Sequence, residues 1–170
     1  MAEVAVELVS RVVRSPVGAL TLIASDAGLA AVLWPDDDPR RVRLVAASET
    51  VPHPLLDRAE AQLEDYFAGR ATGFDVPLDL RGTAFQREVW AALRTIPYGK
   101  TRSYVAIARQ IGRPDASRAV GAANGRNPVS IIVPCHRVVG SAGALTGFAG
   151  GMAVKARLLR LESGRGDLFD

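Results

Sequence analysis

The sequence predicts an α+β fold in which a small N-terminal β-sheet domain, residues 1–80, precedes a mostly helical C-terminal domain, residues 81–170. Short apolar runs separated by turn residues fill the first part, whereas helical periodicity dominates the second. The net charge also differs in sign between the two parts. Residues 1–80 hold seven basic and thirteen acidic residues, a net charge of −6, and residues 81–170 hold fourteen basic and five acidic residues, a net charge of +9. Composition and charge both change near Gly82, which is the expected boundary.

The composition excludes several classes of protein. With 170 residues, 48% of them hydrophobic, the chain can bury a core without disulfides or metal. Its single cysteine excludes an internal disulfide and, with only two histidines, argues against a structural zinc site. No apolar run reaches the length of a membrane span, and the N-terminus lacks the apolar stretch of a signal peptide. We therefore expect a soluble, cytoplasmic protein without a metal or a membrane partner.

The N-terminal half predicts a sheet and one helix. Apolar runs bounded by Ser-Pro-Val-Gly and Asp-Ala-Gly turns favour an antiparallel meander. Alternating apolar residues favour a further strand with one buried face. The expected elements are strands at 4–13, 20–24, 29–34 and 74–80, an exposed acidic loop at 36–39 and a helix at 54–68. No catalytic constellation is visible in this half, so we expect a scaffold.

The C-terminal half predicts helices with short connections. Thr83 and Gln86 match a capping box, and Ser103 is the expected N-cap of a second helix that ends at a glycine. Two more helices are expected at 115–123 and 152–161. Two helices joined by a tight glycine-containing turn in a basic context indicate a helix-turn-helix. An ordinary helical hairpin is the alternative, because periodicity alone does not distinguish the two.

The basic half favours an anionic partner, most often nucleic acid; the alternative is a solvated basic face. The expected helix at 115–123 is poor in bulky side chains, and Arg118 is its main long polar group. Small residues let a helix approach a DNA groove closely, but they offer little to read base edges. Packing of this helix inside the core is the alternative.

The single cysteine lies in a setting that suits nucleophilic chemistry. Cys135 follows Pro134 and precedes His136, after an apolar run and before a glycine-rich loop. A histidine can help to form the reactive thiolate, and a carboxylate can orient that histidine. Because neighbours on a strand face opposite ways, both side chains can serve one site only if the chain turns at Pro134. Glu162 is the candidate carboxylate, since residues 116–161 hold no acid. The alternatives are a buried structural thiol and a core histidine.

The motifs of the second half resemble those of the DNA repair methyltransferases that act on O6-alkylguanine. The resemblance covers residues 84–162, with the motifs in the family's order and spacing. These motifs are Phe85-Gln86-x-x-Val89-Trp90, Ile96-Pro97-x-Gly99-x-Thr101-x-Ser103-Tyr104, Arg118-Ala119-Val120-Gly121, Asn127-Pro128, Pro134-Cys135-His136-Arg137-Val138, Gly147-Phe148-Ala149-Gly150-Gly151 and Lys155-x-x-Leu158-Leu159-x-x-Glu162. Phe148 and Ala149 depart from the tyrosine and serine of some relatives, so a contact from Ala149 to a base would come from its backbone.

This resemblance implies a ribonuclease-H-like N-terminal domain, a winged helix-turn-helix-like C-terminal domain and direct reversal of DNA alkylation without a cofactor. Cys135 would take the alkyl group of O6-alkylguanine irreversibly, once per molecule, with O4-alkylthymine as a further candidate substrate. His136, through a water, and Glu162 would form the activating relay. Asn127 would stabilise the turn that carries the cysteine.

The resemblance also implies that the partner is double-stranded alkylated DNA, bound through the minor groove by a protein that is monomeric in solution. Cooperative assembly along DNA stays open. Tyr104 would hydrogen-bond the departing guanine, and Arg118 would fill the gap left by the flipped-out nucleotide. The other residues that the resemblance places at the DNA or the base are Thr101, Ser103, Ala119, Gly121, Ala122, Arg126, Val138, Phe148, Ala149, Gly150 and Lys155.

Three other functions fit parts of the pattern. A relative that binds alkylated DNA without repairing it would lack the cysteine, so Cys135 argues against that function. A cysteine hydrolase would need an oxyanion hole and would leave the basic helix-turn-helix unexplained. A transcription regulator would need longer side chains than the helix with Arg118 presents. The DNA repair function accounts for all of the motifs together.

Overall fold

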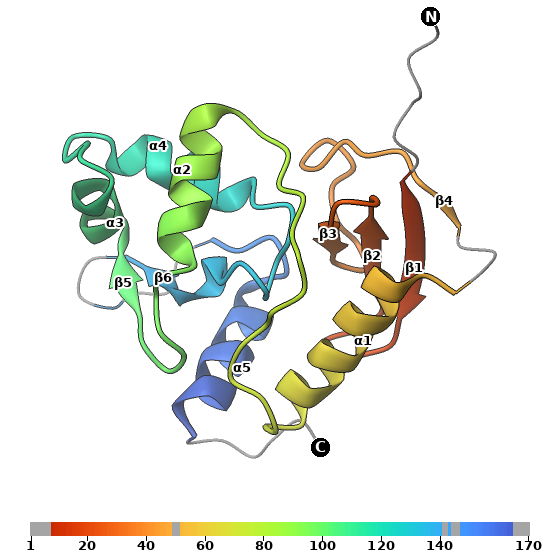
Figure 1. Cartoon of the computed structure of the whole chain (residues 1–170). Coiled ribbons are helices and arrows are strands. Elements are labelled where there is room, and N and C mark those ends of the chain that lie inside the picture. The colour runs from red at the N-terminus through yellow and green to blue at the C-terminus, as the bar shows by residue number, and fades with distance from the viewer. Residues whose placement is uncertain (1–7, 49–51, 141–142, 144–146, 165–170) are drawn as a thin grey trace, which may run out of the picture.

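The structure, a computed structural model, describes residues 8–48, 52–140, 143 and 147–164, and its two halves lie side by side (Figure 1). The N-terminal half contains a four-stranded sheet and one helix, and the C-terminal half is mostly helical, so the predicted α+β class is confirmed. The elements are β1 (Val9–Val13), β2 (Leu20–Ala24), β3 (Leu29–Leu33), β4 (Ala47–Ser48), α1 (Pro54–Phe67), α2 (Ala84–Leu93), β5 (Arg102–Ser103), α3 (Tyr104–Gln110), α4 (Ser117–Gly125), the single turn η1 (Cys135–Arg137), β6 (Val138–Val139) and α5 (Met152–Ser163).

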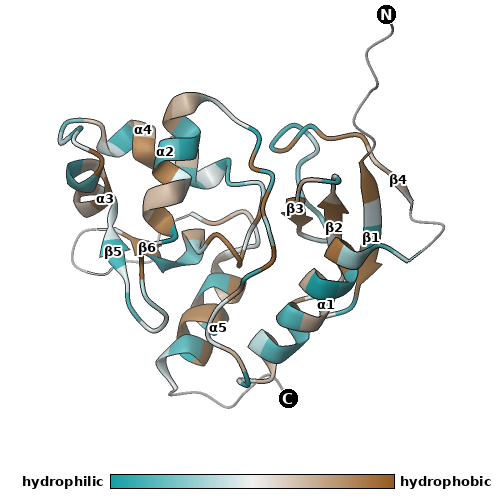
Figure 2. Cartoon of the chain, viewed as in Figure 1, coloured by the Kyte–Doolittle hydropathy of each residue, from teal (hydrophilic) through white to brown (hydrophobic). Residues whose placement is uncertain are grey.

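β1, β2 and β3 form the predicted antiparallel meander, although residues 4–7 of the first predicted strand lie outside the described residues. β4 joins the meander in parallel with β1, giving the order β3-β2-β1-β4. β2 and β3 are hydrophobic along almost their whole length, whereas α1 has a hydrophilic and a hydrophobic side (Figure 2). The buried residues of α1 include Leu56, Ala59 and Leu63, which recur at helical spacing. α1 therefore packs its apolar stripe against the sheet.

The strand predicted at 74–80 does not form. Leu78 makes one isolated bridge to Leu29 of β3, in which the Leu29 N–H donates to the Pro77 carbonyl (2.8 Å) and the Asp79 N–H donates to the Leu29 carbonyl (2.9 Å). Proline has no N–H, so Pro77 cannot donate to a ladder. The segment instead belongs to the connection that runs between the two halves from α1 to α2 (Figure 1).

Local signals located the C-terminal helices. The Thr83 hydroxyl accepts from the Gln86 N–H (3.1 Å) and the Gln86 side chain accepts from the Thr83 N–H (3.0 Å), which confirms the capping box. Ser103 caps α3 by accepting a backbone N–H at 3.0 Å. α4 begins at Ser117, two residues later than predicted, because the chain closes a turn at Arg113 and Ala116 (2.9 Å) before it enters the helix.

One hydrophobic core runs through both halves. Leu22 and Tyr66 of the N-terminal half and Trp90 and Val120 of the C-terminal half all belong to it, and none is more than 1% exposed. The Trp90 indole N–H donates to the Ala123 carbonyl (2.8 Å) and so ties α2 to α4. No helix in the described part of the chain is long and apolar enough to cross a membrane. The shared core fixes how the halves sit together, and thus which side chains meet between them.

Candidate active site

Cys135 lies at the start of η1, beneath the surface. Pro134 precedes it with φ −81° and ψ 63°, and the Cys135 N–H donates to the Val133 carbonyl (2.8 Å). The chain thus turns at Pro134, as predicted. Ile131 adopts a left-handed φ of 73°, which is rare for a β-branched residue and marks a tightly constrained approach to the site. Cys135 is 4% exposed, so a reactant has to enter the protein to reach its thiol.

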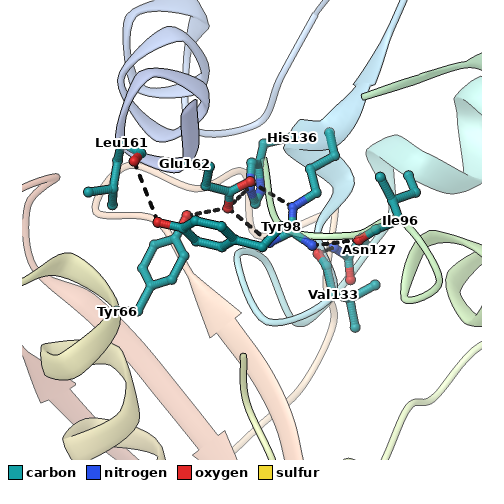
Figure 3. A network of polar contacts seen from close by, with 9 residues as sticks. Tyr66, Ile96, Tyr98, Asn127, Val133, His136, Leu161 and Glu162 are labelled. Carbon is teal, nitrogen blue, oxygen red and sulfur yellow. Dashed lines mark hydrogen bonds and ion pairs between the residues drawn. The ribbon is translucent and has the colours of Figure 1, made fainter. Parts of the chain in front are cut away.

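His136, the residue after Cys135, meets Glu162 in the interior (Figure 3). His136 Nε2 lies 2.7 Å from Glu162 Oε2, and the two side chains are 0% and 1% exposed. Arg137, the next residue of η1, donates two hydrogen bonds to the same carboxylate. Its Nε lies 2.7 Å from Oε1, and one Nη lies 3.0 Å from Oε2. The other Nη of Arg137 donates to the Ile96 carbonyl (2.7 Å). The carboxylate is therefore held in one orientation by a forked cation while it contacts the imidazole.

The surroundings of His136 and Glu162 determine whether each of them is charged. Burial by itself raises the pKa of Glu162, but hydrogen bonds from His136, Arg137 and Tyr66 and the attraction of His136 lower that pKa to about 2. Burial lowers the pKa of His136, and the charges of Arg137 and Lys155 lower it further, against the raising effect of Glu162. At neutral pH the site therefore contains a carboxylate and a neutral imidazole, which is the form that can accept a proton.

The cysteine has its own polar surroundings. Asn127, fully buried, donates to the Val133 carbonyl (2.8 Å) and accepts from the Val129 N–H (3.0 Å), so it braces the loop that leads to Cys135. Burial raises the pKa of the Cys135 thiol, whereas a hydrogen bond with Asn127 and the charges of Arg41 and Lys155 lower it. The thiol thus needs a base to ionise near neutral pH, and positive charge is present to stabilise the thiolate.

Lys155 and Val138, which were both predicted to contact DNA or the base, lie in the interior of the protein. Lys155 is 0% exposed, and its ammonium group donates to the Val138 carbonyl (2.7 Å). Val138 is also 0% exposed. Neither residue lies at the surface, so a contact with DNA could involve only a base that enters the protein, and this contact stays a prediction. The pKa of Lys155 is lowered by burial and raised by the charge of Cys135, so its charge acts on the thiolate.

The other predicted contacts lie on α4 and near it. Arg118, Ala119 and Ala122 are exposed along one side of α4, and exposed Arg126 caps its C-terminus, whereas its buried side carries the apolar contacts to the core. Gly121 faces the ring of Tyr104, and a Cβ at this position would lie 3.7 Å from that ring, which is an ordinary van der Waals contact. The structure thus brings four predicted residues onto one open helix face.

The remaining predicted residues flank the site at two places. Thr101 is exposed beside β5, and Ser103 is half-buried and serves as the N-cap of α3. Phe148 packs edge-on against Trp34, with ring centroids 5.4 Å apart, while Ala149 is exposed. A Cβ on Gly150 would lie 2.8 Å from the Trp34 ring, so a glycine is required there. Trp34, from the N-terminal half, therefore fixes the described part of the loop that follows the cysteine.

The N-terminal half contributes directly to the site, contrary to the expected inert scaffold. The Tyr66 hydroxyl of α1 donates to Glu162 Oε2 (2.6 Å), and the Arg41 guanidinium donates to the Asn127 carbonyl (2.7 Å). The Arg41 guanidinium pairs with the Asp37 carboxylate at 2.5 Å, so Asp37 is partly buried, whereas residues 36 and 38–39 of the predicted acidic loop are exposed. The one available signal was that Tyr66 falls on the apolar side of its helix, where a buried hydroxyl needs a partner.

No three His, Cys, Asp or Glu side chains come together as a metal-ion site within the described ranges. Residues 84–164 match the family model described as 6-O-methylguanine DNA methyltransferase, DNA binding domain. Residues 8–80 match the model described as 6-O-methylguanine DNA methyltransferase, ribonuclease-like domain.

Two curated relatives and one solved structure show the extent of the similarity. A methylated-DNA–protein-cysteine methyltransferase of Mycobacterium bovis is 53% identical over 156 residues, which covers 91% of this chain and 92% of the relative. A protein of the same name from Methanosarcina acetivorans is 48% identical over 149 residues, which covers 88% of this chain and 94% of the relative. The crystal structure of Mycobacterium tuberculosis OGT in complex with DNA superposes with a TM-score of 0.85 at 49% identity, covering 95% of this chain and 99% of that one.

Proposed function

Because this chain belongs to the 6-O-methylguanine DNA methyltransferase family, whose enzymes repair DNA by transferring an alkyl group to a cysteine of the protein, we propose that Cys135 accepts the alkyl group of O6-alkylguanine in DNA. One observation carries the assignment. The chain has a single cysteine, and the next residue, His136, forms a buried pair with Glu162. The acceptor and the relay that would activate it therefore occupy one place in the fold.

The proposed reaction begins with proton removal. His136 Nδ1 is buried without a hydrogen-bond partner among the described residues, and it takes the Cys135 proton through a water. The imidazolium that forms is stabilised by Glu162, 2.7 Å from the opposite ring nitrogen. Lys155 and Arg41 stabilise the thiolate electrostatically. Asn127 keeps the loop before Cys135 in place.

The second step is displacement at the alkyl carbon. The thiolate forms an S–C bond as the C–O6 bond breaks, and the electron pair passes to the guanine ring. The ring takes up the proton that the thiol gave and leaves as guanine, so no other reactant is needed. Donation from Tyr104 and from the backbone at Ala149 would stabilise the developing charge. A thioether is not readily hydrolysed, so each molecule acts once.

The burial of the thiol supports base flipping. A sulfur on a residue that is 4% exposed cannot reach a base stacked in a duplex, so the damaged nucleotide has to leave the helix. The open face of α4, lined by small residues, suits close approach to the minor groove, and Arg118 near its start would occupy the gap in the base stack. O4-alkylthymine, which presents an alkyl group on a similar exocyclic oxygen, is a second candidate substrate.

We place this activity in a monomer that acts on double-stranded DNA in the cytoplasm, with residues 1–80 and 81–170 as its domains. Cooperative assembly along DNA would add contacts between neighbouring copies and is tested by the steepness of the binding isotherm.

The first prediction concerns Cys135 itself. After incubation with a duplex containing O6-methylguanine, intact and peptide mass spectrometry should show a gain of one methylene unit, mapped to Cys135. The Cys135→Ser variant should bind the duplex and gain no mass. Binding of the unaltered protein without a mass change would indicate a damage-binding protein, and a gain elsewhere would displace Cys135 as the acceptor.

The second prediction concerns Arg118. If this residue fills the gap left by a flipped nucleotide, Arg118→Ala should slow repair of O6-methylguanine in duplex DNA by roughly tenfold or more, since unstacking costs a few kcal/mol. It should leave the reaction with the free base O6-benzylguanine unchanged, because no duplex has to be opened. Arg160→Ala removes an equal charge from the exposed side of α5 and is the matched control. Equal slowing on both substrates would contradict a flipping role.

A further inference from the structure

A tyrosine of the N-terminal half reaches the carboxylate of the relay. Tyr66 lies in α1, 96 positions before Glu162, and its hydroxyl donates to Glu162 Oε2 at 2.6 Å (Figure 3). The Tyr66 side chain is fully buried. Burial and the adjacent Glu162 charge raise the pKa of Tyr66, so its hydroxyl keeps its proton and acts as a donor at every working pH. The contact is therefore a permanent, charge-assisted hydrogen bond.

The oxygen that accepts this bond is the one that His136 uses. Glu162 Oε2 is approached by the Tyr66 hydroxyl at 2.6 Å, by His136 Nε2 at 2.7 Å and by an Arg137 Nη at 3.0 Å. Oε1 receives the Nε of Arg137. Donors that share one oxygen compete for its negative charge. Each of them lowers the attraction that the oxygen exerts on the others.

Because of the charges around the imidazole, competition for Glu162 Oε2 affects the protonation of His136. His136 faces one anion, Glu162, and two cations, Arg137 and Lys155, all of them buried. The nearby Tyr98 directs its hydroxyl to the Leu161 carbonyl at 3.5 Å. Whether His136 carries a proton thus depends on how strongly a single carboxylate oxygen attracts it. Tyr66 acts on that oxygen directly.

We propose that Tyr66 is a positioning residue of the relay, which holds Glu162 Oε2 against His136 and, by sharing its negative charge, keeps the imidazole neutral and ready to accept the thiol proton. This proposal rests on the proposed function for its effect on rate, but its effect on His136 can be measured without DNA. It also gives the N-terminal domain a specific part in the chemistry, because α1 supplies the hydroxyl.

The test is Tyr66→Phe, which removes the oxygen and keeps the ring. That ring packs against Phe67 and Phe74, with centroids 5.3 and 5.4 Å away, so the phenylalanine can retain the packing. Tyr98→Phe is the matched control, since it removes a hydroxyl from the same cluster that points elsewhere. Thermal melting establishes that both variants are folded.

The primary readout is an NMR titration of the two histidine side chains. In Tyr66→Phe the titration midpoint of His136 should rise by roughly half a pH unit to one unit, because Glu162 then attracts the imidazole proton more strongly. The His53→Gln variant, which removes the other histidine of the chain, assigns the signals of His136. Tyr98→Phe should leave the His136 midpoint unchanged.

The second readout is the pH dependence of alkylation by free O6-benzylguanine. The acid limb of the rate profile should move upward with the His136 midpoint, so that the rate on that limb falls by up to roughly tenfold. If Tyr66→Phe does not fold, replacing the tyrosines by fluorotyrosine strengthens the donor and should move the His136 midpoint downward. An unmoved His136 midpoint in a folded variant would overturn the proposal. Absence of alkylation in the unaltered protein would instead reject the proposed function and leave the titration as a valid test.

Discussion

Replacing Arg137 by methionine is expected to lower the free energy of unfolding by about 3–5 kcal/mol, because it leaves a buried carboxylate without its cation. Arg137 and Glu162 are 8% and 1% exposed and are joined at 2.7 and 3.0 Å. Glu162 would have to stay charged in a medium that solvates it poorly or take up a proton. For a chain of this length the loss corresponds to a fall in melting temperature of roughly 6–20 °C. Chemical and thermal denaturation measure it directly.

An exposed ion pair provides the control. The side chains of Arg58 and Asp75, 47% and 72% exposed, form an ion pair at 2.9 Å that water and salt screen, so Arg58→Ala should lower the free energy of unfolding far less than Arg137→Met does. A double variant, Arg137→Met with Glu162→Leu, should recover part of the loss, since it removes the stranded charge as well. If Arg137→Met is no more destabilising than Arg58→Ala, the pair does not contribute to stability as proposed.

The second large effect concerns the rate of alkyl transfer. His136→Gln is expected to slow the reaction with an O6-methylguanine duplex by roughly 10²- to 10⁴-fold, because glutamine can keep a hydrogen bond to Glu162 but cannot accept the thiol proton. His136 is 0% exposed, so the affinity for DNA should stay the same. Single-turnover kinetics give the rate, and fluorescence anisotropy gives the affinity.

The pH dependence distinguishes loss of a base from loss of structure. Burial raises the pKa of Cys135, so without His136 the thiolate appears only at alkaline pH. The rates of the variant and the unaltered protein should therefore converge as the pH rises. His53→Gln, a change at the residue before α1, should leave the rate unchanged. A variant that remains equally slow at high pH would show that His136 holds the structure instead of moving a proton.

Arg41 and Tyr66 show what the sequence did not reveal. Each lies in the half that was expected to be a scaffold, and each contacts a residue of the other half, Asn127 and Glu162 respectively. Their positions in the sequence carry no motif. Their partners are set by the way α1 and the loop after β3 pack against the C-terminal half, which depends on the shared core as a whole.

Features that arise from local interactions could be predicted from the sequence alone. The capping box at Thr83, the N-cap at Ser103 and the strands of the meander depend on residues a few positions apart, so periodicity and turn chemistry suffice to locate them. The candidate nucleophile could also be predicted from the sequence, because Cys135 is the only cysteine and stands beside His136. The resemblance of its motifs pointed to the family that the comparisons then identified.

The folded chain as a whole determines which distant groups meet. Folding places Glu162 against His136, adds Arg137 and Tyr66 to the same carboxylate and buries Lys155 in the interior. The physical reason is that burial and charge depend on contacts between segments far apart in the chain. A carboxylate keeps its charge in the interior only when several donors converge on it, and that convergence is a property of the folded chain.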